Sequence, residues 1–174
     1  SSNTAAGSAC CGAGIGPTRI DAVIGICKAY TTRVGAGPFV TELTGEVGDR
    51  MQSVGCEFGA TTGRKRRCGW LDMVLVRQSV RVAGITGIAL TKLDVLTGID
   101  PLRICVGYKI GDEIFSESVP PTTKALGECA PVYEEMPGWT EDIGGAKTMD
   151  DLPANARKYI MRLEGLAGVP VSLV

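Results

Sequence analysis

Apolar residues in the segment 152–166 recur every three to four positions, which is the spacing of one face of an α-helix. Pro153 would stand in the first turn of this helix, and Gly168 and Pro170 would end it. The pattern therefore predicts an amphipathic helix that covers a core. Its buried face is expected to consist of Leu152, Ala156, Tyr159, Ile160 and Leu163.

Three further segments carry weaker helical patterns. The segment 70–82 is apolar nearly all round and stops at Gly84, so we predict a buried helix, with a strand as the alternative because β-branched residues are frequent. Apolar positions at helical spacing after Pro17 also predict a helix over 17–27, and a short helix is predicted over 41–54. Residues 1–16 are small and glycine-rich, and we expect them to form a loop.

Strands are predicted where short apolar or β-branched runs end at turn-forming residues. Gly111-Asp112 separates two such runs, which indicates a hairpin, whereas residues 117–148 are expected to be irregular. Strands that alternate with helices predict an α/β fold in which helices cover both faces of a mostly parallel sheet. The predicted strands span residues 30–34, 85–90, 102–110, 113–116 and 171–174.

The composition is that of a globular protein. A length of 174 residues is sufficient for one domain with its own core, and 44% of the residues are hydrophobic and 21% charged. The formal net charge of −1 argues against a general nucleic-acid binder. No apolar run approaches the length of a transmembrane helix. Residues 1–4 contain neither a basic segment nor an apolar core, so no signal peptide is predicted.

Seven cysteines and no histidine limit the chemistry open to this polypeptide. The cysteines form no CxxC pair, so no metal site is expected, and an odd number without regular spacing is typical of reduced thiols. Without histidine, acid–base chemistry would depend on carboxylates, lysines or cysteines. The adjacent Cys10 and Cys11 are predicted to be a site of close packing and not a redox pair.

The segment 59–70 is the most informative part of the chain. Four consecutive cations follow a Thr-Thr-Gly turn and precede an apolar segment. A glycine-rich turn directs backbone N–H groups toward an anion, and guanidinium groups add paired hydrogen bonds to carboxylate or phosphate. We therefore predict a loop that binds a small, doubly anionic ligand, with a solvated basic run as the alternative. The cations are Arg64, Lys65, Arg66 and Arg67.

A second candidate site, Thr91-Lys92-Leu93-Asp94, follows the predicted strand 85–90. A carboxylate at the end of a strand can accept hydrogen bonds from both N1–H and the amino group of guanine, a donor pair that adenine lacks. The aliphatic stem of Lys92 would cover the purine ring. Ligands of open α/β sheets bind at these ends. The segment therefore predicts guanine recognition by Asp94, with a solvated loop as the alternative.

Several long strings along essentially the whole chain resemble adenylosuccinate synthetase, the purine-pathway ligase. The resemblance implies a P-loop-NTPase-like, mostly parallel sheet flanked by helices. Residues 1–174 would form a single partial domain of it, with a small antiparallel hairpin. The matching strings lie at residues 1–4, 14–17, 28–39, 41–43, 57–64, 69–72, 90–96 and 133–139.

The resemblance implies a GTP-dependent carbon–nitrogen ligase of AMP biosynthesis. In the family, GTP phosphorylates the 6-oxygen of IMP, and the amine of L-aspartate then displaces that phosphate to give adenylosuccinate. The implied ligands are GTP, IMP and L-aspartate, and the implied cofactor is Mg²⁺, with its ligands outside this chain. A cytoplasmic homodimer that binds neither nucleic acid nor membrane is also implied.

The resemblance assigns roles to residues by their position in the matching strings. Arg64 corresponds to a residue that also contacts IMP, and Arg66 to one that reaches the nucleotide phosphates. Val34 and Gly35 correspond to the turn beside the IMP ribose. The guanine-selecting segment corresponds to Lys92, Leu93 and Asp94. The aspartate loop corresponds to Ala60, Thr61, Thr62, Gly63, Arg64, Lys65 and Arg66.

Several family features are not present in this sequence. Family chains are more than twice as long, with a GDEGKGK phosphate loop that carries the catalytic aspartate and a histidine that acts as the acid. Three side chains that complete the IMP site and a final guanine-contacting segment are also absent. The resemblance therefore implies a central to C-terminal section without catalytic residues, inactive by itself. An incomplete sheet would expose apolar edges, so association between copies is expected.

Two other functions stay open at this stage. A stand-alone guanine-nucleotide module would use one carboxylate for base selection, with weak affinity because no phosphate loop is present. Nucleic-acid binding by the basic run is disfavoured by the acidic balance. The pair Glu134 and Glu135 is expected to be exposed loop charge, and Trp70 and Trp139 are expected to anchor the core or loops.

Overall fold

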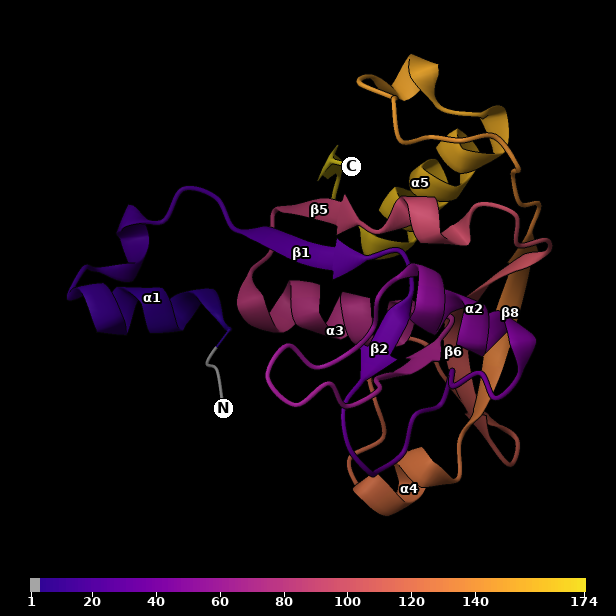
Figure 1. The fold of residues 1–174 in the computed structure, drawn as a ribbon. Helices are drawn as coiled ribbons and strands as arrows, with labels where there is room; N and C mark the ends of the chain where they lie inside the picture. Colours follow the sequence, from indigo (N-terminus) through magenta and orange to yellow (C-terminus); the bar gives the residue numbers. More distant parts are fainter. Residues whose placement is uncertain (1–3) are drawn as a thin grey trace.

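Three parallel strands form the centre of the computed structural model, which describes residues 4–174 (Figure 1). β1 (Ile24–Lys28) pairs with β5 (Gly87–Thr91), and β5 pairs with β9 (Val171–Leu173). The strands predicted over 85–90 and 171–174 are therefore confirmed. The signal-peptide prediction concerns residues 1–4, of which 1–3 lie outside the described residues.

Helices α3 (Met73–Ala83) and α5 (Ala154–Ala167) pack together on one face of this sheet. On the other face, Ile24 and Ile26 of β1 are 48% and 82% exposed. Helices therefore cover only one face within the described residues, in contrast to the expected cover on both. The physical reason is that much of the remaining chain builds a second sheet, so it does not cross back over the first.

The second sheet has four strands and is mostly antiparallel. β4 (Leu71–Asp72) runs parallel to β6 (Leu102–Ile110), whereas β7 (Glu113–Phe115) and β8 (Ala130–Met136) pair with β6 antiparallel. The β6–β7 hairpin confirms the hairpin prediction. A separate two-stranded ribbon of β2 (Thr31–Arg33) and β3 (Arg67–Gly69) lies beside α2. α2 spans Glu46–Val54, so the helix predicted over 41–54 begins later than expected.

Asp72 determines where α3 begins. Its Oδ1 accepts hydrogen bonds from the amides of Val74 at 3.1 Å and Leu75 at 3.2 Å, and its Oδ2 accepts one from the hydroxyl of Tyr108. An N-cap of this kind satisfies amides that have no partner inside the helix. The helix predicted over 70–82 thus begins at Met73, and it ends at Gly84 as expected, in the left-handed conformation (φ +65°).

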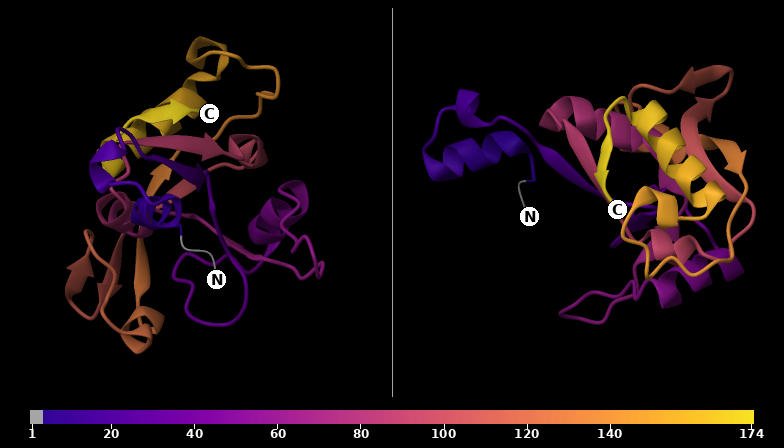
Figure 2. Two further views of the ribbon diagram at one scale, coloured as in Figure 1. Left: turned by 90° about the vertical axis from the view of Figure 1, so that its left-hand side faces the viewer. Right: turned by 90° about the horizontal axis from the view of Figure 1, so that it is seen from above.

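The structure contradicts three predictions of local structure. Residues 17–27 are not a helix: a 3₁₀ turn over Pro17–Arg19 is followed by β1, because pairing with β5 outweighs the helical spacing of the apolar residues. Residues 1–16, predicted as a loop, contain α1 (Ala6–Ala13), which projects from the body of the molecule (Figure 2). The region 117–148 contains α4 (Thr123–Gly127) and β8, which long-range pairing with β6 stabilises.

Glu134 and Glu135 lie on β8, so the prediction of a loop here is wrong, whereas Glu135 is exposed as expected, with 56% side-chain exposure. The Glu134 carboxylate forms two hydrogen bonds with the guanidinium of Arg162 on α5, at 2.8 and 2.7 Å. Glu135 pairs with Arg103 of β6 at 2.8 Å. Each carboxylate therefore ties its strand to a neighbouring element.

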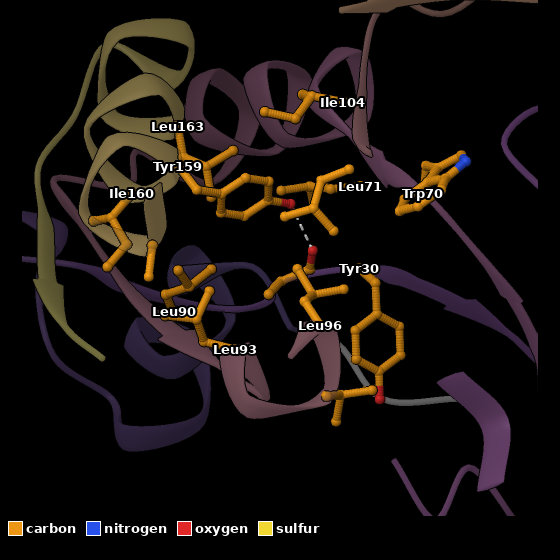
Figure 3. Packing of buried hydrophobic residues seen from close by; sticks show 14 of the residues in the cluster. Tyr30, Trp70, Leu71, Leu90, Leu93, Leu96, Ile104, Tyr159, Ile160 and Leu163 are labelled. Atoms are coloured by element: carbon orange, nitrogen blue, oxygen red, sulfur yellow. Dashed lines mark hydrogen bonds between the residues drawn. The ribbon is translucent and has the colours of Figure 1, made fainter. Parts of the chain in front are cut away.

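The core lies between the three-stranded sheet and the two helices (Figure 3). The predicted face of α5 is buried, which confirms that prediction. Tyr159 donates a hydrogen bond to the carbonyl of Ala29 at 2.8 Å, and its ring meets that of Trp139 edge to face, with centroids 6.0 Å apart. Trp70 and Trp139 are 5% and 4% exposed, so both anchor the core as expected. Tyr159 thus fixes the chain just after β1.

Substitution Tyr159→Phe is expected to lower the free energy of unfolding by about 1–3 kcal/mol, because the buried carbonyl of Ala29 loses its donor. Urea unfolding followed by tryptophan fluorescence measures the change. Tyr133→Phe is the matched control, because the Tyr133 hydroxyl has no hydrogen-bond partner among residues 4–174, and we expect it to change stability by less than about 0.5 kcal/mol. Equal effects of both substitutions would contradict the assignment.

Candidate functional site

The basic run forms one side of a tight hairpin. Phe58 and Lys65 form an isolated antiparallel bridge, and inside it the amide of Gly59 donates to the carbonyl of Arg64 at 2.8 Å. The amide of Gly63 donates to the carbonyl of Gly59 at 2.8 Å, and Gly63 has φ +63°, a conformation that favours glycine. The predicted turn is therefore present, with the two threonines at its tip.

The tip of this hairpin faces solvent. Residues 60–65 are all exposed, and within the described part of the chain the side chains of Arg64 and Lys65 have no hydrogen-bond or ion-pair partner. The Thr62 hydroxyl accepts a hydrogen bond from the Arg64 amide at 3.4 Å. Two exposed cations and two hydroxyls thus stand together at the tip, with the donor groups that an anionic ligand requires.

Arg66 and Arg67 are held by other residues of the chain, in contrast to the two cations at the tip. Arg66 Nη1 donates to Glu57 Oε2 at 2.9 Å. Arg67 donates two hydrogen bonds to the Glu42 carboxylate, from Nε to Oε1 at 2.6 Å and from Nη2 to Oε2 at 2.5 Å. The run of four similar cations is therefore divided by the fold into an exposed pair and a supported pair.

Arg67 also fixes the turn of Val34 and Gly35, which only the family resemblance relates to IMP. Its Nη1 donates to the carbonyls of Gly35 at 3.1 Å and Gly37 at 2.9 Å. Val34 is 59% exposed, and Gly35 has φ +82°, a conformation that favours glycine. The basic segment and the Val34–Gly35 turn therefore lie together, joined through one guanidinium.

Glu57 is the buried carboxylate at the base of the hairpin, with 1% exposure. Its Oε1 accepts hydrogen bonds from Lys28 Nζ and from Tyr30 Oη, both at 2.6 Å, while Oε2 accepts from Arg66. Burial opposes ionisation, but these three donors outweigh it and hold the pKa of Glu57 below its ordinary value. Burial and the bond to Glu57 raise the pKa of Tyr30, so its hydroxyl stays protonated as a donor.

The second predicted segment lies at the carboxyl end of β5. Thr91 is the last residue of the strand, Lys92 follows with φ +62°, and Leu93 is buried while Asp94 is exposed. The Lys92 ammonium donates to the Gly55 carbonyl at 3.1 Å. The strand thus ends where expected and its last polar residues reach the surface.

A cavity of about 630 Å³ opens at this end of the sheet. Its walls come from the end of β5, from residues 143–149 and from β9. Apolar side chains such as Leu90 and Met149 line it together with the charged groups of Asp94 and Lys147. A mostly apolar hollow with a few polar groups is typical of a small-molecule site.

The sheet brings the two predicted sites to the same edge. Lys28, which reaches Glu57, is paired in register with Thr91, and Lys92 holds Gly55 just before Glu57. The sequence interpretation missed Lys28, Tyr30 and Glu57 as parts of the site. The available signal was an isolated glutamate directly before the Phe-Gly that opens the basic turn, and a lysine that ends an apolar run.

Among residues 4–174, no group of three or more histidine, cysteine, aspartate or glutamate side chains is placed to hold a metal ion. In that same part of the chain, no helix is both long and apolar enough to cross a membrane.

An exposed cationic turn and a cavity at the carboxyl ends of the strands place the chain in the class of open α/β-sheet proteins, which bind small molecules at that edge. The adenylosuccinate synthetase family model matches residues 1–174, so the chain belongs to this family. Adenylosuccinate synthetases of Syntrophus aciditrophicus and Moorella thermoacetica are 69% and 64% identical over all 174 residues.

The solved structures lead to the same family. A fully ligated adenylosuccinate synthetase from Plasmodium falciparum superposes with a TM-score of 0.94 at 41% identity, and the match covers 98% of this chain and 41% of that one. The chain spans about 40% of the length of the curated relatives that it matches. The predicted fold class, an α/β fold with a parallel sheet, flanking helices and an antiparallel hairpin, is confirmed.

Substitution Glu57→Gln is expected to weaken the pH dependence of stability. Because the folded-state pKa lies below the ordinary value of about 4.3, the ionised carboxylate stabilises the fold above that pH, and the contribution is lost as pH falls through the folded pKa. Urea unfolding of both proteins at a series of pH values measures this. The stability difference between wild type and variant should shrink below about pH 4. A constant difference at all pH values would contradict the assignment.

Proposed function

We propose that this chain supplies the amino-acid loop and the guanine pocket of a GTP-dependent ligase that joins IMP and L-aspartate to give adenylosuccinate, GDP and phosphate. One observation carries the proposal: an exposed cationic hairpin and a cavity bordered by Asp94 are joined at the same edge of one sheet. Membership in the adenylosuccinate synthetase family supports the same reaction.

In the proposed reaction, the tip and base of the hairpin together bind the two carboxylates of L-aspartate. Arg64 and Arg66 supply guanidinium groups, and Thr61 and Thr62 supply hydroxyls. Fixing both carboxylates orients the amine toward its target, so the loop contributes by positioning and not by proton transfer. The remaining loop residues, Ala60, Gly63 and Lys65, shape the turn and add charge.

The proposed guanine pocket is the cavity at the end of β5. Asp94 stands at its border and would accept the N1–H and amino hydrogen bonds of guanine, while the stem of Lys92 and the backbone of Leu93 would border the ring. Adenine would leave the Asp94 carboxylate without this donor pair, which disfavours adenine.

IMP is proposed to lie against the turn of Val34 and Gly35, with Arg64 between the two substrates. The support is that Arg67 holds the carbonyl of Gly35, and thereby ties this turn to the basic segment. The side chains of Arg67 and Glu42 are 30% and 27% exposed, so this ion pair is partly buried and supports the turn from within the protein.

Other properties of the complete enzyme are proposed from the family alone. They are a Mg²⁺ cofactor, a cytoplasmic location and a homodimeric state. Residues 1–174 are proposed to be one partial domain that has no catalytic residue of its own and is inactive as an isolated chain.

A polypeptide of full family length that carries these residues is expected to convert GTP, IMP and L-aspartate into adenylosuccinate, measured by absorbance. Arg64→Gln should lower kcat/KM for L-aspartate about 10- to 100-fold, because a charge-assisted hydrogen bond is lost. Arg103→Gln, which removes an exposed arginine of β6, is the control and should leave kcat/KM unchanged. Lack of product from the unsubstituted polypeptide would contradict the function, and product from residues 1–174 alone would contradict the inactivity.

The second candidate function is a stand-alone guanine-nucleotide binding module, and the observation that favours it is the cavity bordered by Asp94. Calorimetric titration of residues 1–174 with GDP tests it. The ligase proposal predicts weak binding, because no phosphate loop contributes. Tight binding that Asp94→Asn abolishes would favour the module.

A further inference from the structure

The two arginines proposed to bind the amino-acid substrate differ in how they are supported. Within the described residues, the Arg64 guanidinium has no protein partner, whereas Arg66 Nη1 lies 2.9 Å from Glu57 Oε2. The difference arises from their place in the hairpin: Arg64 is at the open tip, and Arg66 is beyond the bridge that closes it.

The backbone of Arg66 is fixed as well as its side chain. Its amide donates to the Glu57 carbonyl at 2.9 Å, and its carbonyl accepts from Gln52 Nε2 of α2 at 2.8 Å. Glu57 and Arg66 are therefore opposite each other across the base of the hairpin. Backbone pairing therefore holds the Glu57 carboxylate and the Arg66 guanidinium close together, so their contact does not require two flexible side chains to find each other.

The Glu57 carboxylate is buried, while its charged partners extend to the surface. Glu57 has 1% side-chain exposure, compared with 28% for Lys28 and 32% for Arg66. Two cations share one carboxylate, so the cluster presents a net charge of +1 to solvent. The Nε and Nη2 groups of Arg66 have no partner among the described residues and are free to donate to an anion.

We propose that Glu57 is a positioning residue of the amino-acid site: its carboxylate holds the Arg66 guanidinium from behind, so that the free donors of Arg66 receive a carboxylate of the substrate. This inference rests on the proposed function. Lys28 and Tyr30 complete the arrangement, because they fix the other carboxylate oxygen to the end of β1. A side chain that contacts a ligand is usually held in place by hydrogen bonds from a residue behind it.

The opposing explanation is that the cluster is a structural ion pair with no influence on substrate binding. A buried ion pair contributes little net stability, but removal of one partner leaves an uncompensated charge. Loss of stability on substitution of Glu57 therefore does not distinguish the two explanations. A selective change in affinity for one substrate does.

Glu57→Gln is tested in the active polypeptide of full family length. We expect KM for L-aspartate to rise about tenfold or more, with KM for IMP changed less than about twofold, at a temperature where circular dichroism shows the variant folded. Glu135→Gln is the matched control, because it also removes a carboxylate that pairs with an arginine, far along the chain on β8. It should leave both KM values unchanged.

A double-mutant cycle shows whether Glu57 acts through Arg66. Glu57→Gln combined with Arg66→Gln should have the same KM for L-aspartate as Arg66→Gln alone, and Glu135→Gln combined with Arg66→Gln should also equal Arg66→Gln alone. A further rise in the first combination would overturn the proposal. An unchanged KM in the active Glu57→Gln variant would also overturn it, whereas an inactive unsubstituted polypeptide would refute the proposed function instead.

Glu57→Asp is the second variant, for the case that Glu57→Gln does not fold. It keeps the buried charge but shortens the side chain by one methylene, which moves the carboxylate away from Arg66. The same selective rise in KM for L-aspartate is expected, of smaller size. A folded Glu57→Asp variant with the KM of the unsubstituted enzyme would overturn the proposal.

Discussion

The site depends on a buried carboxylate that is satisfied on both of its oxygens. Taking Glu57 out of water is unfavourable unless the ionised group is hydrogen-bonded, and three donors from two parts of the chain meet this requirement. Lys28 and Tyr30 come from the end of β1 and the residues after it, and Arg66 comes from the hairpin. The sheet edge and the basic loop are therefore fixed to one another by the need to compensate one charge.

The same constraint divides the basic run into two kinds of cation. Arg66 and Arg67 are each held by a carboxylate, whereas Arg64 and Lys65 extend into solvent. A supported guanidinium binds its ligand with little loss of conformational freedom, and an unsupported one can adapt to it. A site with both kinds of cation has one guanidinium in a fixed position and another that can move to meet the ligand. This combination suits a small ligand with two carboxylates.

The sequence predicted the elements that are specified locally. α5 has a regular apolar face and a glycine stop, the β6–β7 hairpin has a glycine turn, and the strand before Thr91 is a short apolar run, so all three are present. β1 was predicted as a helix, because the spacing of its apolar residues fits a helix and its pairing with β5 depends on residues more than 60 positions away. β8 was missed for the same reason, since its partner β6 is distant in the sequence.

The candidate site was predicted in part. The Thr-Thr-Gly turn, the exposed Arg64 and the polar end of β5 follow from residue type and spacing. The roles of Glu57 and Lys28 do not, because a buried carboxylate with two cations requires three segments to meet in space. Residue type alone also does not distinguish Arg66 and Arg67 from Arg64, although in the fold Arg66 and Arg67 each have a carboxylate partner.

The most direct measurement of this account is a pair of crystal structures of the complete enzyme, without and with L-aspartate bound. If Glu57 positions Arg66, then Arg66 Nη1 stays within hydrogen-bond distance of Glu57 in both states, near the 2.9 Å seen here, while the Arg64 side chain reorients toward the ligand. An Arg66 guanidinium that leaves Glu57 when the amino acid binds would contradict the account.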